Sequence, residues 1–447
     1  MWIKIAVVHS DQKVIYLPPS FALELGATTA IRFGGRSAQT AVNYQNNLEI
    51  TTPNAFDAPA TVKLSDKLQD ELCLPQSPVY QLRIVDSQII LGPVIGFLLG
   101  NAVYRYNPKH MTKYSDRFGI YPKIGGITVA FAPSLIHWDN HTVDGLYYNH
   151  LTAEWEYGRF PLPEVIYRRD FHSDPALIQQ LIDYTGGRLF NSYRFTKYEL
   201  FSFLRRDSEL REYLPPTEYT LNFDQIFQFI HDYQKVILKP VHLSRGRGIC
   251  IIEKIAGQYR VVDFRCKQKQ PTIYQLYNDD LLHNFFAVYQ DLFSRYLIQK
   301  YLSLAKVANS PFDIRAVMHK HPDQGWGCTG IECRVSNNGY LTNISRGGYA
   351  LTLEEALQQA FPRNARSLAA QIHEFCRKFC RCMDTFGEHF AEFGMDIALD
   401  RDQKLWLIEA NVFPSFKGFK KMDLATYLAI RYNPMLYAAS LTPFGAG

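Results

Sequence analysis

Near its C-terminal end the sequence reads Phe393-Gly-Met-Asp396-Ile-Ala-Leu-Asp400-Arg-Asp-Gln-Lys404-Leu-Trp-Leu-Ile-Glu409-Ala-Asn411. Two apolar runs surround a polar turn at residues 400–403, which is the pattern of a β-hairpin. A hairpin brings Asp396 and Glu409 together, and Glu409 and Asn411 share one strand face because they are two residues apart. Carboxylate and amide oxygens are ligands that Mg²⁺ takes in proteins. We therefore predict a metal site formed by Asp396, Glu409 and Asn411.

An exposed polar face of the hairpin is the alternative interpretation of these side chains. The second strand carries Leu407, Ile408, Ala410 and Val412 around Glu409, so we expect it to be buried on both sides. A buried carboxylate needs a metal ion or a cationic partner. The pattern therefore favours a metal site over a solvated face.

A second polar segment lies upstream, between two predicted strands. The strand Val236-Ile-Leu-Lys239-Pro240 leads into this segment, and another strand starts at Cys250. Glycines allow backbone N–H groups to approach an anion, and a serine and two arginines add side-chain donors. The spacing differs from a Walker loop and no helix follows, so P-loop and dinucleotide-binding folds are disfavoured; a simple hairpin tip would have the same composition. The predicted phosphate clamp consists of Ser244, Arg245, Gly246, Arg247 and Gly248.

The first 85 residues are expected to form a small β-rich, barrel-like module. Residues 17–27 return in weakly similar form as residues 64–74, and each copy is followed by a strand-like segment. A repeated unit of short helix and strand indicates a pseudo-symmetric barrel. No motif with evident chemistry occurs there, so a scaffold or partner-binding role is favoured.

Downstream of this module, strands and helices alternate, as in an open α/β layer fold. Predicted strands cover residues 91–99, 127–131 and 164–167, and predicted helices cover 114–118, 175–185, 197–212 and 223–232. The expected fold class is α/β with mixed α+β character. We expect three domains: the module 1–85, an α/β domain 86–190, and a domain 191–447 with subdomains of about 191–300 and 301–447.

Composition excludes several classes of protein. The chain has 447 residues, 47% hydrophobic and 20% charged, so disorder is not expected. A net charge of +5 over this length does not predict a nucleic-acid partner. The longest apolar stretch, residues 89–100, is interrupted by glycine and proline and is shorter than the roughly 20 residues of a membrane helix. The N-terminus lacks a signal-peptide pattern, so we expect a cytoplasmic protein.

Two segments have both a structural and a functional interpretation. Cys376, Cys380 and Cys382 cluster among eight thinly scattered cysteines, but no fourth ligand stands at zinc spacing, so helix packing by reduced thiols is favoured. Residues 274–296 are hydrophobic and rich in tyrosine and phenylalanine. They could form a partner surface, but an amphipathic helix packed on its subdomain is favoured.

Six short motifs follow one another in the second half of the chain. They are Lys197 at the start of a predicted helix, Lys239, Gln299-Lys300-Tyr301-Leu302, Asp313-Ile-Arg315, Asn343-Ile-Ser-Arg346-Gly347-Gly348, and Asp396 with Glu409-Ala-Asn411. This order resembles that of ATP-grasp proteins, and the spacing of Asp396 and Glu409 resembles that of their D-alanine ligase branch. Three further segments, Gly92-Pro-Val-Ile-Gly96, Phe160-Pro-Leu-Pro-Glu-Val-Ile-Tyr167-Arg and Leu214-Pro-Pro-Thr217, are similar to the YheC/YheD family of endospore coat-associated proteins. The resemblance covers nearly the whole chain and implies an ATP-grasp fold in a bacterial spore-former.

The resemblance also implies roles in binding ATP and Mg²⁺. Lys197 and Lys239 would contact the nucleotide phosphates, and the segment from Ser244 to Gly248 would close over them. The backbone of Gln299, Lys300, Tyr301 and Leu302 would form the hinge that reads adenine. Asp396, Glu409 and Asn411 would hold one or two Mg²⁺ ions. Arg315 and Arg346 would steady an acyl phosphate, because guanidinium forks match phosphate geometry.

The leading functional hypothesis is an ATP- and Mg²⁺-dependent ligase that joins a carboxylate to an amine, or to a thiol, through an acyl phosphate. It would act in sporulation or in biogenesis of the spore coat or cell wall. One alternative is an ATP-binding structural protein of the endospore coat without turnover, and another is a kinase that phosphorylates a hydroxyl. The implied partners are ATP, a carboxylate, an amine and spore coat proteins, and the implied location is the cytoplasm or the coat.

Overall fold

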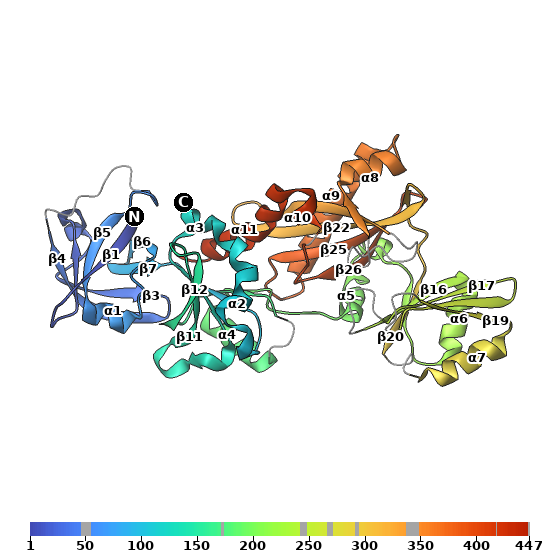
Figure 1. The fold of residues 1–447 in the computed structure, drawn as a ribbon, viewed down its shortest axis with the longest axis horizontal. Helices are drawn as coiled ribbons and strands as arrows, with labels where there is room; N and C mark the ends of the chain where they lie inside the picture. The colour runs from blue at the N-terminus through green and yellow to red at the C-terminus, as the bar shows by residue number, and fades with distance from the viewer. Residues whose placement is uncertain are drawn as a thin grey trace.

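The computed structural model describes residues 1–45, 55–170, 174–241, 248–265, 271–290, 295–336, 348–416 and 418–445. Figure 1 shows a barrel followed by three sheets, arranged along the long axis of the molecule. The described helices include none that is long and apolar enough to cross a membrane.

The N-terminal module is a closed seven-stranded barrel, as predicted from the internal repeat. The 3₁₀ helix η1 (Pro19–Leu23) precedes one strand, and α1 (Asp66–Leu72), which buries Leu68 and Leu72, precedes another, so the repeated unit of short helix and strand is confirmed. The strands are β1 (Trp2–Val8), β2 (Val14–Leu17), β3 (Thr28–Phe33), β4 (Arg36–Tyr44), β5 (Ala60–Ser65), β6 (Val79–Val85) and β7 (Gln88–Gly92), in the order β1-β5-β2-β4-β3-β7-β6.

The second sheet mixes parallel and antiparallel strands and is flanked by η3 (Thr112–Ile120) and α4 (Pro175–Tyr184). Its strands are β8 (Val94–Leu98), β9 (Ile127–Phe131), β10 (Ile136–His137), β11 (Thr142–Asn149), β12 (Glu154–Pro161), β13 (Val165–Arg168) and β14 (Leu189–Phe190). The prediction of one strand over residues 91–99 is wrong. The run divides at Pro93, which has no N–H for a ladder, so β7 belongs to the barrel and β8 to the second sheet.

The third sheet is antiparallel, and two amphipathic helices pack on it: α6 (Phe223–Tyr233) and α7 (Asp279–Val288). Leu282, Phe285 and Phe286 of α7 are buried, which confirms an amphipathic helix within residues 274–296. In sheet order the strands are β15 (Thr217–Tyr219), β20 (Tyr296–Lys300), β16 (Lys235–Pro240), β17 (Cys250–Ile255), β18 (Gln258–Asp263) and β19 (Thr272–Leu276).

The fourth sheet contains the predicted hairpin as β25 (Glu392–Leu399) and β26 (Leu405–Asn411). Its apolar face packs against α8 (Leu353–Ala360) and α9 (Ala365–Asp384), whose Cys376 and Cys380 are buried in that core, as the helix-packing interpretation requires. The other strands are β21 (Lys306–Val307), β22 (Ser310–His321), β23 (Gly325–Val335) and β24 (Tyr349–Leu351). At the end of the chain, α10 (Phe419–Met422) and α11 (Leu424–Ser440) cover part of the opposite face around Val317.

Candidate active site

Four neighbouring strands of the fourth sheet present a row of charged side chains. Glu332 on β23 pairs with Arg315 on β22, Arg315 with Asp396 on β25, and Asp396 with Glu409 on β26. Direct cross-strand partners point to the same side of a sheet. We call this side, with Asp313 and Arg334 in the adjacent row, the charged face.

Two arginines hold Asp396 within the charged face. Arg315 donates from Nε to Oδ1 at 2.5 Å and from Nη2 to Oδ2 at 3.0 Å, and Nη2 of Arg334 lies 3.0 Å from Oδ1. Arg334 also donates to both oxygens of Asp313, at 2.7 and 2.6 Å. Burial alone would raise the pKa of Asp396, but the two guanidinium groups outweigh it and lower the pKa to about 2. Asp396 is therefore ionised at neutral pH.

Sequence reasoning missed Arg334 and Glu332. The alternation Glu332-Cys333-Arg334 places both charges on one strand face and could have identified them. Glu332 is 3% exposed, and its Oε2 has no hydrogen-bond partner among the described residues. Burial raises its pKa to about 7 despite the opposing effect of Arg315 and Arg334.

Lys197 connects the charged face to the third sheet. It is the first residue of α5 (Lys197–Leu204), where Thr196 and Glu199 cap each other's backbone N–H groups in a capping box that fixes the helix start. Its Nζ lies 4.0 Å from Oε2 of Glu409 and donates to the carbonyl of Pro240 on β16 at 3.4 Å. Lys197 therefore lies at the junction of the two sheets, next to one of the predicted metal ligands.

Lys239 approaches the same junction from β16. Its Nζ donates to Oε1 of Gln299 at 2.5 Å, and Nε2 of Gln299 donates to the hydroxyl of Thr217 at 2.8 Å. Burial lowers the pKa of Lys239 to about 8, with Lys197 adding to the shift and Glu409 opposing it. The structure thus brings Lys197, Lys239 and Glu409 together across the junction.

The predicted hinge runs along the end of β20. The N–H of Lys300 donates to the carbonyl of Pro216 at 2.9 Å, and the N–H of Tyr301 donates to that of Lys235 at 3.0 Å. The ammonium group of Lys235 lies 4.6 Å from the centre of the Tyr301 ring. Both N–H groups are therefore already engaged, and Leu302 is the next residue whose N–H could face a base.

Several predicted site residues fall outside the described part of the chain. Gly248 is described and has φ +73°, a left-handed conformation that suits glycine. The predicted site residues that lie outside the described ranges are Ser244, Arg245, Gly246, Arg247 and Arg346.

The donor set suits a hard cation only in part. Asn411 donates from Nδ2 to Oε1 of Glu409 at 3.0 Å, so its amide oxygen and the partly exposed Glu409 carboxylate are oxygen donors of the kind that Mg²⁺ takes. Both oxygens of Asp396 already accept hydrogen bonds from arginine. Within the described ranges, no cluster of three or more His, Cys, Asp or Glu side chains could hold a metal ion. Glu409 and Asn411 therefore fit Mg²⁺ better than Asp396 does.

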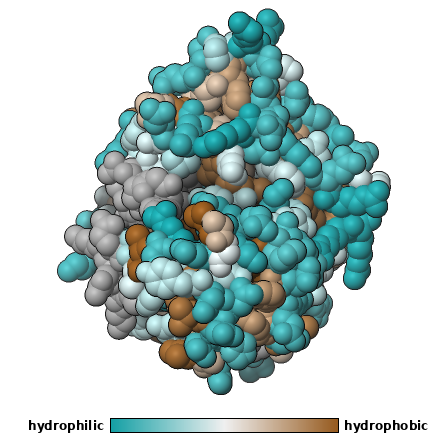
Figure 2. Space-filling model, turned by 90° about the vertical axis from the view of Figure 1, so that its right-hand side faces the viewer, coloured by the Kyte–Doolittle hydropathy of each residue, from teal (hydrophilic) through white to brown (hydrophobic). Residues whose placement is uncertain are grey.

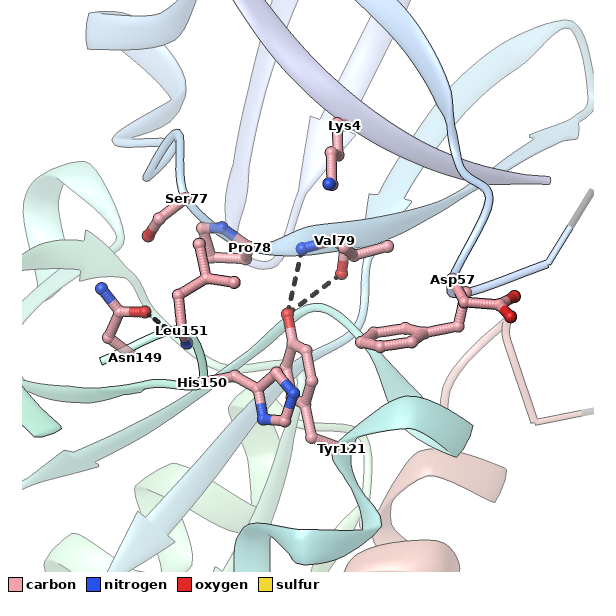
Figure 3. Close-up of a pocket in the computed structure, with 10 residues that line it drawn as sticks. Lys4, Asp57, Ser77, Pro78, Val79, Tyr121, Asn149, His150 and Leu151 are labelled. Atoms are coloured by element: carbon pink, nitrogen blue, oxygen red, sulfur yellow. Dashed lines mark hydrogen bonds between the residues drawn. The ribbon is translucent and has the colours of Figure 1, made fainter. Parts of the chain in front are cut away.

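A separate pocket of about 180 Å³ is lined by residues of the barrel and of the segments around the second sheet (Figure 3). Figure 1 shows that the barrel and β20 lie toward opposite ends of the molecule. The Tyr121 hydroxyl hydrogen-bonds to the N–H and carbonyl of Val79, and the ring of His150 stacks on Tyr121 with centroids 4.5 Å apart. The side chain of Lys4 points toward Val79 and Tyr121 (Figure 3). None of the predicted site residues lines this pocket.

The family model described as YheC/D like ATP-grasp matches residues 186–441, more than half of the chain. The chain belongs to this family. Its ATP-grasp fold, predicted from the order of six motifs, is thereby confirmed. As a YheC/D like ATP-grasp protein, it carries both sheets of the candidate site within the matched range.

Two curated relatives come from Bacillus subtilis (strain 168). Endospore coat-associated protein YheD is 27% identical over 442 residues, which is 94% of this chain and 91% of YheD. Endospore coat-associated protein YheC is 24% identical over 314 residues, covering 68% of this chain and 84% of YheC. Among solved structures, D-alanyl-alanine synthetase A from Vibrio cholerae matches with a TM-score of 0.41 and 10% identity, covering 77% of this chain and 99% of the synthetase.

Proposed function

We propose that this YheC/D like ATP-grasp protein is an ATP- and Mg²⁺-dependent ligase that joins a carboxylate to an amine through an acyl phosphate. The observation that carries the proposal is the junction at which Lys197, 4.0 Å from Glu409, and Lys239 meet the charged face. It combines cations for a triphosphate with oxygen donors for a divalent ion. A thiol in place of the amine would use the same acyl phosphate.

Each group at the junction has a distinct task. Lys197 and Lys239 would bind the phosphates of ATP, with the segment from Ser244 to Gly248 closing over them. The segment Gln299 to Leu302 would hold adenine through its carbonyls and the N–H of Leu302, because the N–H groups of Lys300 and Tyr301 are engaged. Glu409 and Asn411 would hold Mg²⁺, with Asp396 as a further ligand. When bound, the ion supplies positive charge that neutralises the phosphates.

The reaction then needs positioning and charge stabilisation more than a protein nucleophile. A carboxylate oxygen attacks the γ-phosphorus and ADP departs; the amine then attacks the acyl carbon, phosphate departs, and the amine loses a proton. Arg315 and Arg346 would steady the negative charge on the transferred phosphoryl group, and Arg334 would keep Asp396 and Arg315 in register. Preorganised donors of this kind supply much of the rate enhancement in phosphoryl transfer.

The test is phosphate release from ATP and Mg²⁺ across a panel of amino acids, short peptides and spore-wall precursors, with mass spectrometry of the products. The expected result is ADP, phosphate and a new amide or thioester with at least one carboxylate. Phosphorylated product without an amide would instead identify a kinase. Absence of magnesium-dependent ATP binding by folded protein would remove the proposal.

The second candidate is an ATP-binding structural protein of the endospore coat that has lost turnover. Its support is that the relatives YheD and YheC are both named endospore coat-associated proteins. The coloured part of the face in Figure 2 shows hydrophobic side chains in separate patches among hydrophilic ones, not one continuous docking area. Protein that binds Mg-ATP but yields no product with any carboxylate, and that assembles into coats, would favour this candidate. Either function would place the protein in the cytoplasm of a sporulating cell or in its coat.

A further inference from the structure

The segment Pro414–Phe416 lies on the charged face next to the proposed metal ligands. It begins three residues after Asn411, and Pro414 packs directly on Gly394, where an added Cβ would lie 2.3 Å from the Cβ of Pro414. Gly394 pairs with Asn411 and stands two residues before Asp396. Because the packing is this close, a shift of this segment would displace the neighbouring side chains of the charged face.

Two arginines from different sheets hold consecutive carbonyl groups of this segment. Arg169, directly after β13 of the second sheet, donates from Nη2 to the carbonyl of Pro414 at 2.9 Å. Arg315 donates from Nη1 to the carbonyl of Ser415 at 3.3 Å while its other nitrogens hold Asp396. The segment thus joins Arg169 to the Arg315–Asp396 pair.

Arg169 is itself firmly fixed. Its Nη1 donates to both oxygens of Glu392 at 2.8 Å and to the hydroxyl of Tyr167 at 2.9 Å, and Tyr167 donates to Glu392 at 2.9 Å. Glu392 is fully buried; burial raises its pKa, but Arg169 and then His319 bring it down to about 2. The guanidinium group also lies 5.2 Å from the ring centre of Phe416. Because Glu392 is buried and ionised, and because several guanidinium nitrogens of Arg169 donate hydrogen bonds at once, the Arg169 side chain is held in one position.

We propose that Arg169 is a positioning residue: from the second sheet it holds Pro414–Phe416, and through Ser415 it sets the guanidinium of Arg315 against Asp396. This inference rests on the proposed function, because it assigns to Arg315 a task in the reaction. It also gives the second sheet a part in catalysis without any contact to the nucleotide. The adjacent Arg168 offers a matched comparison, since it too pairs with a buried acid, Asp170, but donates to the carbonyl of Ser192 instead.

The experiment compares Arg169→Lys, Arg169→Met and Arg168→Met in the full chain. Arg169→Lys keeps a positive charge next to Glu392, but its single ammonium group cannot also donate a hydrogen bond to the carbonyl of Pro414. This variant should therefore stay folded and should not restore turnover. We expect kcat to fall about 10- to 100-fold in both Arg169 variants, with ATP affinity within about twofold of the wild type. Arg168→Met should lose stability with kcat nearly unchanged.

Hydrogen exchange gives a readout that needs no turnover. In Arg169→Lys, the amides of residues 412, 413, 415 and 416 should exchange faster than in the wild type, and in Arg168→Met they should not. Equal losses of kcat in Arg168→Met and Arg169→Lys, or unchanged exchange in Arg169→Lys, would overturn the inference. A wild-type protein without turnover, but with the expected exchange difference, would refute the ligase and leave the contact between Arg169 and the segment established.

Discussion

The two sheets that meet at the candidate site differ in how they hold a buried charged side chain. On the third sheet, Lys239 is held by a neutral amide, Gln299, and burial lowers its pKa to about 8. On the fourth sheet, Asp396 is held by two arginines, which lower its pKa to about 2. Burial next to a neutral amide moves the pKa of a lysine toward physiological pH, whereas direct hydrogen bonds from two arginines keep a buried carboxylate charged. The charge on Lys239 of the third sheet is therefore adjustable, whereas the charge on Asp396 of the fourth sheet is fixed.

The largest expected effect comes from Glu409→Gln. The near-isosteric amide removes the charge that would hold Mg²⁺ near the triphosphate, while the contact with Asn411 can persist. Turnover should fall below detection with the circular dichroism spectrum and melting temperature little changed. Wild-type turnover in this variant would exclude Glu409 as a magnesium ligand.

The next effect concerns the stability of the fourth sheet. Arg334→Met leaves Asp313 and part of Asp396 buried without their cation, so the free energy of unfolding should drop by about 3 to 5 kcal/mol. Denaturant titration measures this change. The matched control is Arg377→Met, which removes an exposed ion pair with Glu374 on α9 and should change stability far less. Equal effects of the two substitutions would contradict a stabilising role for the buried ion pairs of Arg334.

A smaller effect is expected at Arg346, which lies outside the described residues. If its guanidinium stabilises charge at the acyl phosphate, Arg346→Ala should lower kcat by about 100-fold or more. ATP affinity, measured by calorimetry, should change much less. A parallel loss of affinity and kcat would instead place Arg346 at the nucleotide.

The smallest expected effect concerns the charge on Lys239 and the pH dependence of ATP binding. Above a pH of about 8 Lys239 loses its charge, so ATP affinity should weaken about tenfold or less between pH 7 and pH 9. The pKa of this lysine is lower in the folded than in the unfolded chain, so its contribution to stability becomes more favourable as pH rises above about 8. Lys239→Met should remove this part of the pH dependence of ATP binding. An unchanged profile in the variant would assign it to another group.

Local patterns were predicted well where neighbours in sequence decide the structure. The hairpin around residues 400–403 and the pairing of Asp396 with Glu409 follow from alternation and a polar turn, and both are present. The predicted helix over residues 197–212 failed in its second half: α5 ends at Leu204, because Asp207 accepts hydrogen bonds from the N–H groups of Glu209 and Leu210 and offers the backbone an alternative to the helix.

The hairpin, the barrel repeat, the amphipathic α7 and the order of motifs can all be predicted from the amino-acid sequence, because periodicity and turn chemistry act over a few residues. The cations that contact Asp396 and the residue that holds Pro414 depend on how the sheets pack in three dimensions. Arg334 reaches Asp396 because β23, β22 and β25 lie side by side, and Arg169 reaches Pro414 because two sheets pack together. Such contacts join residues far apart in the chain, and the packing of whole elements, which no local pattern encodes, brings them within hydrogen-bonding distance.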